Sequence, residues 1–518
     1  MKNLSTIFAT SFKKYRNPIL LLSSSVVSIF FLYSLTGAAT HVTHDEWVGR
    51  GLYPGLALAH GADLYEPEAG PHITLYGAGS ALFYAPTALA STPDSAALLA
   101  FFLNLSALLL ILLHPLHRLL SPLFHNRLER TVAIWCSTIL ILAVLAIEPT
   151  TEGLLRIHAD LPAYFFLIAG VSLFDIYLQR RNVNWLTASC LALSLSIWAK
   201  IPTLPATLFP CLYLAFGGRF KDALLFAFRL AVVFSLTSAC FFLAYGMEDT
   251  LVILFKHVQA ASVWGDRQTL FEGPNNWTRM TYLEATPLLF RFLTMYLGEY
   301  WYLPLAGILA AALAFASERN QPERFYFTNF CIIYALTLPP CLAAVAHFGG
   351  VENSLLFANA TGTTLLLFVT LRLLREQLPP SACTLLLALC AGLLLLPFVR
   401  QSRSAPSDEQ PSANTQAFQY LKSGKTDVYF GWYPIAHLMH DGEILTSIEA
   451  PTWVGQTMPD SIDFSRRHLP PKAKYLATSP TGYGSAVLKQ YLGELKEVPS
   501  PPELPSWRLF ELQDETAP

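Results

Sequence analysis

An acidic pair stands where the chain first leaves an apolar run long enough to cross a membrane. Asp45 and Glu46, preceded by His44, belong to the stretch HVTHDEWVGRGLYPGLALAHGADLYEP (41–67), which follows the apolar residues 18–38. Carboxylates close to lipid are costly and are commonly functional. These residue types suit proton transfer or a divalent cation, although their spacing is not diagnostic of a metal site.

Other polar residues that could contact a substrate lie in connections expected on the same side of the membrane. Glu152, Arg156 and Asp160, in EGLLRIHADLPAYFF, recur every four residues, which predicts one shared helix face. Lys200 stands in SIWAKIPTLPA, at the tip of an expected helical hairpin. The further candidates are Tyr76 in LYGAGSALFYAPTALA (75–90), Lys256 and His257 in the long loop 247–300, and His347 and Asn353 beside the turn in AHFGGVENSLLFANATG.

Each of these residues also has a structural interpretation. A lysine at a helix end can extend its amine to the membrane surface without any further role. Arg156 and Asp160 could form a structural ion pair, and His347 could cap a helix or lie in a loop. Asn104, inside an apolar run, could hydrogen-bond between helices. The acidic pair is harder to explain in this way, because a solvated loop does not require two carboxylates at the lipid exit.

Apolar segments must position these residues, since 53% of the 518 residues are hydrophobic and only 14% are charged. Soluble domains carry about 25% charged residues, so the composition predicts an α-helical polytopic membrane protein. A membrane helix needs about 20 apolar residues, and such runs predict about eleven spans within 1–400. They are expected near 18–38, 95–114, 131–147, 160–178, 185–200, 202–217, 222–245, 301–317, 326–346, 353–371 and 381–399.

Two of these runs, 185–200 and 202–217, are short and separated at Lys200-Ile201-Pro202. The segment 75–90 is apolar but interrupted by glycines and prolines, so it is either a partial span or an interfacial helix. The first run lacks a small-residue cleavage site, which favours a retained signal anchor.

Basic residues in the connections predict the orientation, since cytoplasmic loops are enriched in lysine and arginine. Connections rich in lysine and arginine alternate along the chain with connections that contain few of these residues, and the rich ones lie on the same side as the N-terminus. We therefore expect a multi-pass protein of the cell inner membrane with a cytoplasmic N-terminus. The first outer loop (39–94), the long loop 247–300 and the C-terminal tail are expected outside, in the periplasm of a bacterial cell.

The composition changes after Arg400. QSRSAPSDEQPSANTQ (401–416) has the composition of a polar linker, and 417–518 predicts a small soluble α/β domain. Strands are expected at VYFGW (428–432), KYLAT (474–478) and WRLFEL (507–512). Helices are expected at PIAHLMHDG, which ends in glycine, and at SAVLKQYLGELKEV (485–498).

Several classes of function find no support in the composition. The formal net charge of −2 gives no sign of nucleic-acid binding. All eight cysteines lie in apolar segments and none forms a C-x-x-C pair, which argues against a sulfur-based metal or redox site and against a disulfide framework in the loops.

Several of these stretches together resemble the GT-C glycosyltransferases, which include protein O-mannosyltransferases, the aminoarabinose transferase of lipid A and related polyprenyl-phosphate-sugar transferases. The acidic pair after the first span is followed by a G-x-x-LY element and by YGAG. LLRIHADLPAYFFLIAGVSL is similar to their R-x-x-x-D helix, and SIWAKIPTLPATLFPCLYL to their lysine-bearing outer hairpin. GGVENSLLFANATG resembles a G-x-x-N-Y-L-L element in which Ser354 replaces the tyrosine, and FGWYPIAHLMHDGEIL resembles the start of their outer domain.

The resemblance implies a GT-C fold and inverting transfer of a sugar from a polyprenyl phosphate to an acceptor hydroxyl on a glycan, lipid or protein. It implies that Asp45 is the general base and that Glu46 orients the acceptor or sugar. Cations must then stabilise the leaving phosphate. The implied phosphate ligands are Arg156, Lys200, Lys256 and His257, and the implied substrate contacts are Asp160, Tyr76, His347 and Asn353. No cofactor is obligatory for a monophosphate donor, although a divalent cation is compatible with the acidic pair.

Two other classes of function stay open. A transporter or flippase of an amphiphilic lipid-linked substrate would also place charges near helix ends, but no inverted repeat is evident in the sequence. A membrane scaffold could recruit partners through its C-terminal domain, although this would leave the acidic pair without a role.

Overall fold

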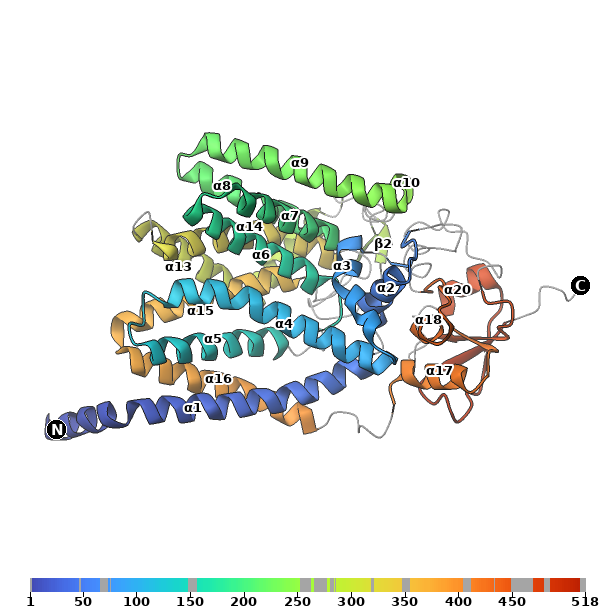
Figure 1. Cartoon of the computed structure of the whole chain (residues 1–518), viewed down its shortest axis with the longest axis horizontal. Helices are drawn as coiled ribbons and strands as arrows, with labels where there is room; N and C mark the ends of the chain where they lie inside the picture. Colours follow the sequence, from blue (N-terminus) through green and yellow to red (C-terminus); the bar gives the residue numbers. More distant parts are fainter. Residues whose placement is uncertain are drawn as a thin grey trace, which may run out of the picture.

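The computed structural model shows an elongated bundle of helices with a small sheet-containing domain packed at one end (Figure 1). The N-terminus lies at the opposite end of the bundle. The structure describes residues 2–45, 48–65, 73–74, 76–147, 156–251, 262–264, 277–279, 284, 286–317, 321–346, 355–403, 411–432, 434–448, 469–478 and 485–512.

Six helices of this described part are long and apolar enough to cross a membrane, which confirms the predicted class of polytopic membrane protein. All six coincide with predicted spans. A bent pair, α12 (Thr286–Glu299) and α13 (Tyr302–Ala316), meets at 80° and would make a seventh span. The six are α1 (Lys2–His44), α4 (Pro93–Leu120), α6 (Asp160–Arg180), α9 (Phe220–Tyr245), α14 (Pro322–Ala346) and α15 (Leu356–Gln377).

The other predicted spans also fall on helices, but the full count of about eleven is not confirmed. Two of them are α5 (Arg127–Ile147) and α16 (Pro380–Arg403). The predicted hairpin consists of α7 (Val183–Ala199), the 3-10 turns η2 (Ile201–Thr203) and η3 (Pro205–Leu208), and α8 (Phe209–Phe216). Its helices are short, and the backbone is extended at Lys200 (φ −156°, ψ 116°). The predicted break at Lys200 is therefore present.

The segment after the first span forms short elements at the domain end of the bundle. α2 (Gly49–Ala59) is followed by α3 (Ala78–Tyr84) and the 3-10 helix η1 (Ala85–Leu89). The seven residues of α3 are too few to cross a membrane, so the apolar segment 75–90 is not a full span. It packs against α2 and the end of α7.

Glycines permit this close packing. A Cβ atom built at Gly77 would lie 1.7 Å from the carbonyl oxygen of Trp198, and one at Gly79 would lie 2.8 Å from the nitrogen of Ala199. Both distances are far below van der Waals contact, so the backbone of the YGAG segment must touch the last turn of α7. That contact fixes the place where the chain continues to Lys200.

The long loop 247–300 is described only in part. It begins with α10 (Met247–Leu251), contains the short antiparallel pair β1 (Ser262–Trp264) and β2 (Trp277–Arg279), and leads into α12.

The C-terminal domain has a four-stranded sheet in the order β3-β4-β6-β5, in which β3 and β4 are parallel and the other neighbours are antiparallel. The predicted helix 485–498 is wrong beyond Leu492. Gly493 has a φ of +76°, and the chain then returns as an edge strand. The elements are α17 (Ala413–Lys422), β3 (Val428–Phe430), α18 (Ile435–Asp441), β4 (Tyr475–Thr478), α20 (Ser485–Leu492), β5 (Lys496–Val498) and β6 (Arg508–Glu511). α16 ends and α17 begins inside the segment 401–416 that was expected to be a linker.

This domain is attached to α2 and to the start of α4. The hydroxyl of Tyr53 in α2 is fully buried, donates to the carbonyl oxygen of Leu445 and accepts from the Leu445 N–H group at 3.0 Å. Burial raises the pKa of Tyr53 well above its ordinary value, so the phenol stays protonated. The hydroxyl of Ser412 likewise donates to Asp94, in the first turn of α4. The domain therefore holds the elements that follow Asp45.

Candidate functional site

Asp45 and Arg156 form a two-point ion pair at the domain end of the bundle. Arg156 donates from Nε to Oδ2 of Asp45 at 2.7 Å and from Nη2 to Oδ1 at 3.2 Å. The side chain of Asp45 is 20% exposed and that of Arg156 is 10% exposed. A guanidinium that donates to both oxygens of a carboxylate fixes its plane as well as its position. Asp45 directly follows α1, which ends at His44, so this pair attaches the first exit from the membrane to residue 156.

The backbone around Arg156 is not helical, and the predicted helix face of Glu152, Arg156 and Asp160 is wrong. α6 begins only at Asp160, and residues 156–159 form a bend followed by a turn. Asn104 in α4 holds this segment by donating from Nδ2 to the carbonyl oxygen of Arg156 at 3.1 Å. Glu152 lies outside the described residues. Asn104 thus does hydrogen-bond between elements, and its partner is the backbone of the candidate site.

Asp160 pairs with Lys200, not with Arg156. Lys200 donates from Nζ to Oδ1 of Asp160 at 2.5 Å, and the carboxylate side chain is 2% exposed. Lys200 itself is 12% exposed, so it does not extend to the membrane surface. A buried ion pair is tolerated only when further hydrogen bonds satisfy its remaining polar atoms. The structural pair of Arg156 with Asp160 that we considered is therefore absent, and the carboxylate needs a second partner.

His158 supplies that second partner. Its Nδ1 contacts Oδ2 of Asp160, while the hydroxyl of Tyr76 lies 2.8 Å from its Nε2. The hydroxyl of Tyr84 bonds both the N–H group and the carbonyl oxygen of His158, at 3.2 and 3.1 Å. Burial lowers the pKa of His158 to about 4, against the opposing effect of Asp160. The neutral ring consequently donates from Nδ1 to Asp160 and accepts from Tyr76 at Nε2.

Lys200 keeps its charge in this setting. Burial lowers its pKa, but the charge of Asp160 together with Tyr76 outweighs that effect and raises the pKa above its ordinary value. The ammonium group also lies 6.0 Å from the ring centre of Tyr76 and 5.9 Å from that of Phe357, within the range of cation–π attraction.

The structure thus brings together four of the predicted residues, Asp45, Arg156, Asp160 and Lys200, with Tyr76 as the fifth. The other predicted residues (Glu46, Lys256, His257, His347 and Asn353) lie outside the described residues. His158 was not predicted. Its place between Arg156 and Asp160, in RIHAD, is the signal that could have identified it.

The arrangement has a definite chemical capacity. Two carboxylate–cation pairs are joined by the short stretch 156–160, so they belong to one site. Arg156 and Lys200 can stabilise negative charge on a phosphate, because both are held in place before any ligand arrives. Asp45 can accept a proton from a hydroxyl group that reaches its carboxylate.

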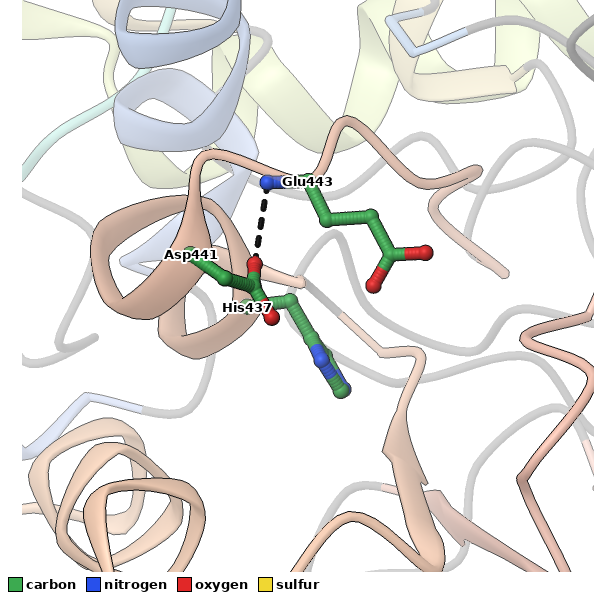
Figure 2. A group of neighbouring side chains, drawn as sticks. All are labelled: His437, Asp441 and Glu443. Carbon is green, nitrogen blue, oxygen red and sulfur yellow. Dashed lines mark hydrogen bonds between the residues drawn. The ribbon is translucent and has the colours of Figure 1, made fainter. Parts of the chain in front are cut away.

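A separate group of residues in the C-terminal domain has the composition of a cation site. The ligand atoms of His437, Asp441 and Glu443 all lie within 4.8 Å of one another (Figure 2). However, Nε2 of buried His437 accepts a hydrogen bond from the N–H group of Phe430 at 3.2 Å, which leaves the proton on Nδ1. Asp441 in turn accepts from the N–H group of Glu443 at 3.0 Å. The histidine has no lone pair to offer a metal, so we assign this group to the stability of the domain.

Comparisons with known proteins gave matches only among solved structures. No family model matches the chain, and no curated protein matches it. The chain is similar to the archaeal oligosaccharyltransferase AglB from Archaeoglobus fulgidus in complex with an inhibitory peptide and a dolichol-phosphate, at 13% identity and a TM-score of 0.41, over 98% of this chain and 75% of that one.

Two further structures are similar in the same way. ArnT from Cupriavidus metallidurans in the apo state matches at 12% identity and a TM-score of 0.42, over 93% of this chain and 97% of that one. The Archaeoglobus fulgidus oligosaccharyltransferase complex with Zn and sulfate matches at 15% identity and a TM-score of 0.47, over 90% and 70%. Because these TM-scores lie below 0.5, the chemistry of this chain has to be argued from its own residues.

Proposed function

We propose that this chain is a membrane glycosyltransferase of the GT-C type, which moves a sugar from a polyprenyl-phosphate donor to an acceptor hydroxyl at the outer membrane surface. The observation that carries the proposal is the ion pair of Asp45 with Arg156. This pair connects the end of α1 to the segment 156–160. Asp160, at the end of that segment, pairs in turn with Lys200.

The donor phosphate would bind to Arg156 and Lys200. Both cations are already held by carboxylates, so they are oriented at the start of the reaction and need little rearrangement. A guanidinium can bind a carboxylate and a phosphate together, because its donors point in several directions. As the bond between the anomeric carbon and the phosphate oxygen breaks, the phosphate gains negative charge that these two cations stabilise.

Asp45 would act as the general base. The acceptor oxygen attacks the anomeric carbon from the side opposite the phosphate, which inverts the configuration. Its proton passes to the Asp45 carboxylate, and the polyprenyl phosphate leaves with the electron pair of the broken bond. Arg156 would orient the base, whereas Glu46 would orient the acceptor or the sugar.

The remaining residues take supporting roles in this proposal. Tyr76 would form part of the sugar site, next to Lys200. Asp160 was expected to contact substrate, but its buried bonds to Lys200 and His158 favour a positioning role instead. The weaker phosphate candidates Lys256 and His257, and the substrate candidates His347 and Asn353, stay predictions from the sequence.

No obligatory cofactor is required by this mechanism, because the phosphate leaving group is stabilised by side-chain cations. A divalent cation near Asp45, Glu46 and His44 is compatible with it, and loss of activity on treatment with a chelator would establish such a requirement. The acceptor would be a glycan, lipid or protein. The position of the site at one end of the bundle favours a transferase over a transporter or flippase, whose substrate site is expected midway along the spans.

The proposal is tested first by the products. Mass spectrometry should find one sugar addition missing from the envelope glycans and glycolipids of a deletion strain, and the gene should restore it. The purified protein in lipid nanodiscs should then transfer that sugar from a labelled polyprenyl-phosphate donor to the acceptor so identified. An unchanged set of glycans and glycolipids, together with movement of the labelled lipid across vesicles without product, would establish transport instead.

A further inference from the structure

A cavity lies at the opposite end of the bundle, away from the candidate site. Its volume is about 650 Å³, and it is lined by the turns α6–α7 and α8–α9, by the last turn of α8 and by the facing surfaces of α13 and α14. In Figure 1 this end also carries the N-terminus of α1. Binding pockets for small molecules commonly have volumes of roughly 300–1,000 Å³. The cavity is therefore large enough to hold a ligand.

Three arginines from three separate places in the sequence meet at this cavity. Arg181 follows α6, Arg219 precedes α9, and Arg324 lies in the first turn of α14. Arg219 is paired with Asp222, Nη2 to Oδ2, at 2.6 Å. Within the part of the chain that the structure describes, no carboxylate pairs with Arg181 or Arg324. The helix dipoles add little net charge, because the N-termini of α9 and α14 and the C-termini of α6, α8 and α13 all lie at the cavity. The cavity is thus suited to an anion.

Most of the remaining lining residues are apolar, and two of them are widely exposed on the surface of the bundle. Phe216 is 73% exposed and Phe315 is 84% exposed, and both border the cavity. Tyr213 and Ile332 line it as well. Exposed phenylalanines beside a membrane helix face acyl chains, whereas arginines at the ends of spans lie at the depth of the headgroups. A ligand that touches both must have a charged head and an apolar body.

We propose that this cavity binds the phosphate headgroup of an anionic phospholipid, with its acyl chains against Phe216 and Phe315. Basic pockets between membrane helices bind anionic headgroups in this manner. The site is separate from the sugar-transfer site and does not depend on the proposed function. A soluble phosphate compound shares the headgroup chemistry, but it would leave the two exposed rings without contacts.

Native mass spectrometry of the full-length protein tests this directly. The protein would be reconstituted in vesicles with equal parts of phosphatidylglycerol and phosphatidylcholine, extracted in mild detergent, and compared with the double variant Arg181→Gln/Arg324→Gln. The control is Arg127→Gln/Arg180→Gln, which removes the same charge from exposed arginines that do not line the cavity. Each lining arginine should contribute about fivefold to retention of the anionic lipid, or roughly 25-fold for the pair.

The expected result is retention of phosphatidylglycerol over phosphatidylcholine by the wild type and the control, with loss of that preference in the lining variant. Equal retention of the two lipids by the wild type, or an undiminished preference in the lining variant, would overturn the proposal. A parallel sample contains inorganic phosphate at millimolar concentration. If phosphate displaces the lipid completely, the cavity is a site for a soluble anion and the lipid assignment is wrong. Thermal unfolding of both variants checks that the helices stay assembled.

Discussion

Asp45 accepts two hydrogen bonds from Arg156, although 111 positions separate them in the sequence. The pair has two consequences for the proposed chemistry. It fixes the plane of the carboxylate that would accept a proton, and it places a guanidinium directly beside the reaction. Removing either partner should therefore affect turnover, but only Arg156 should also affect the binding of the donor phosphate.

The first prediction concerns the base. Asp45→Asn keeps the size of the side chain and one acceptor oxygen for Arg156, but the amide cannot take a proton. The variant should insert and bind the donor nearly as the wild type does, whereas product formation should fall by about 10²–10⁴-fold. The measurement is the turnover of labelled polyprenyl-phosphate sugar by matched amounts of purified protein.

Glu46→Gln and the double variant serve as controls for that assignment. Glu46→Gln should reduce turnover less if Glu46 only orients the acceptor. If Asp45→Asn turns over at the wild-type rate and Glu46→Gln is inactive, the general base is Glu46 and not Asp45. Sugar transfer by the double variant would show that the acidic pair is not catalytic.

The second prediction concerns the donor phosphate. Arg156→Ala and Lys200→Ala should each weaken donor binding by roughly 10- to 150-fold, because a hydrogen bond to a charged group contributes on the order of 1.5–3 kcal/mol. Lys200→Arg should not rescue binding, because a planar guanidinium cannot replace a compact ammonium between Asp160 and two aromatic rings.

Binding is measured with a fluorescent donor analogue in nanodiscs, and the control is Lys425→Ala. Lys425 is an exposed lysine of the C-terminal domain, paired with Glu503, so its loss should not change donor affinity. Unchanged affinity in both site variants would leave Arg156 and Lys200 with structural roles only.

The sequence predicts the class of protein more reliably than it predicts how the candidate residues pair. All six long apolar helices coincide with expected spans, because twenty apolar residues in succession are rare outside membrane helices. The pairs of Asp45 with Arg156 and of Asp160 with Lys200 depend on packing between distant elements, which neither spacing nor composition encodes.

One local error had a signal in the sequence. A helix through 152–160 would have placed Arg156 above Asp160, but Pro162 lacks an N–H group and is favoured in the first turn of a helix. Pro162 therefore favours a helix that begins just before it, as α6 does at Asp160, although other helices of this chain, such as α4 and α14, contain interior prolines. The resulting bend at 156–159 turns Arg156 towards Asp45.

The third prediction concerns the dependence of stability on pH. Burial lowers the pKa of His158 from 6.5 to about 4, and it does the same for His437 in the C-terminal domain. Below pH 6.5 the histidine therefore binds a proton in the unfolded chain, whereas in the folded chain it stays neutral down to about pH 4. Stability should be fully present above pH 6.5 and should fall between 6.5 and 4, by up to about 3 kcal/mol for each histidine.

Thermal unfolding of the wild type and of His158→Asn across this range measures the effect. The variant should be less stable at pH 7, since it loses the bonds to Asp160 and Tyr76, but its stability should decline less steeply on acidification. The contribution of His437 should persist in the variant. Parallel pH profiles for the two proteins would show that the pKa of His158 is the same in the folded and the unfolded chain.

The fourth prediction concerns orientation. A phosphatase that is active only outside the cytoplasm should report activity when it is fused after Arg400 or within 255–280, and it should be silent near Arg127 or Arg324. The reason is that the connections rich in arginine are retained in the cytoplasm. Activity at Arg324 combined with silence after Arg400 would reverse the orientation and would place the candidate site on the inner side.

The fifth prediction concerns the packing that positions Lys200. Gly77→Ala would set a methyl group 1.7 Å from the carbonyl oxygen of Trp198, and no flexible side chain can yield there, because the contact is with backbone. The YGAG segment and the end of α7 must then separate, which should cost about 1–3 kcal/mol of stability and move Lys200 relative to Tyr76. Donor affinity should fall with it, although no atom of the alanine needs to touch the donor.

Gly298→Ala is the matched control for this change. Gly298 lies in α12, and a Cβ atom there would have no heavy-atom neighbour within 4 Å. Because Gly298 is the second-last residue of α12, alanine there should stabilise the helix by at most about 1 kcal/mol. Thermal unfolding and donor binding are measured for the two variants side by side. Stability should fall in Gly77→Ala and rise in Gly298→Ala, and donor affinity should fall in Gly77→Ala alone. Normal donor affinity and normal stability in Gly77→Ala would show that the contact with Trp198 does not hold Lys200 in place.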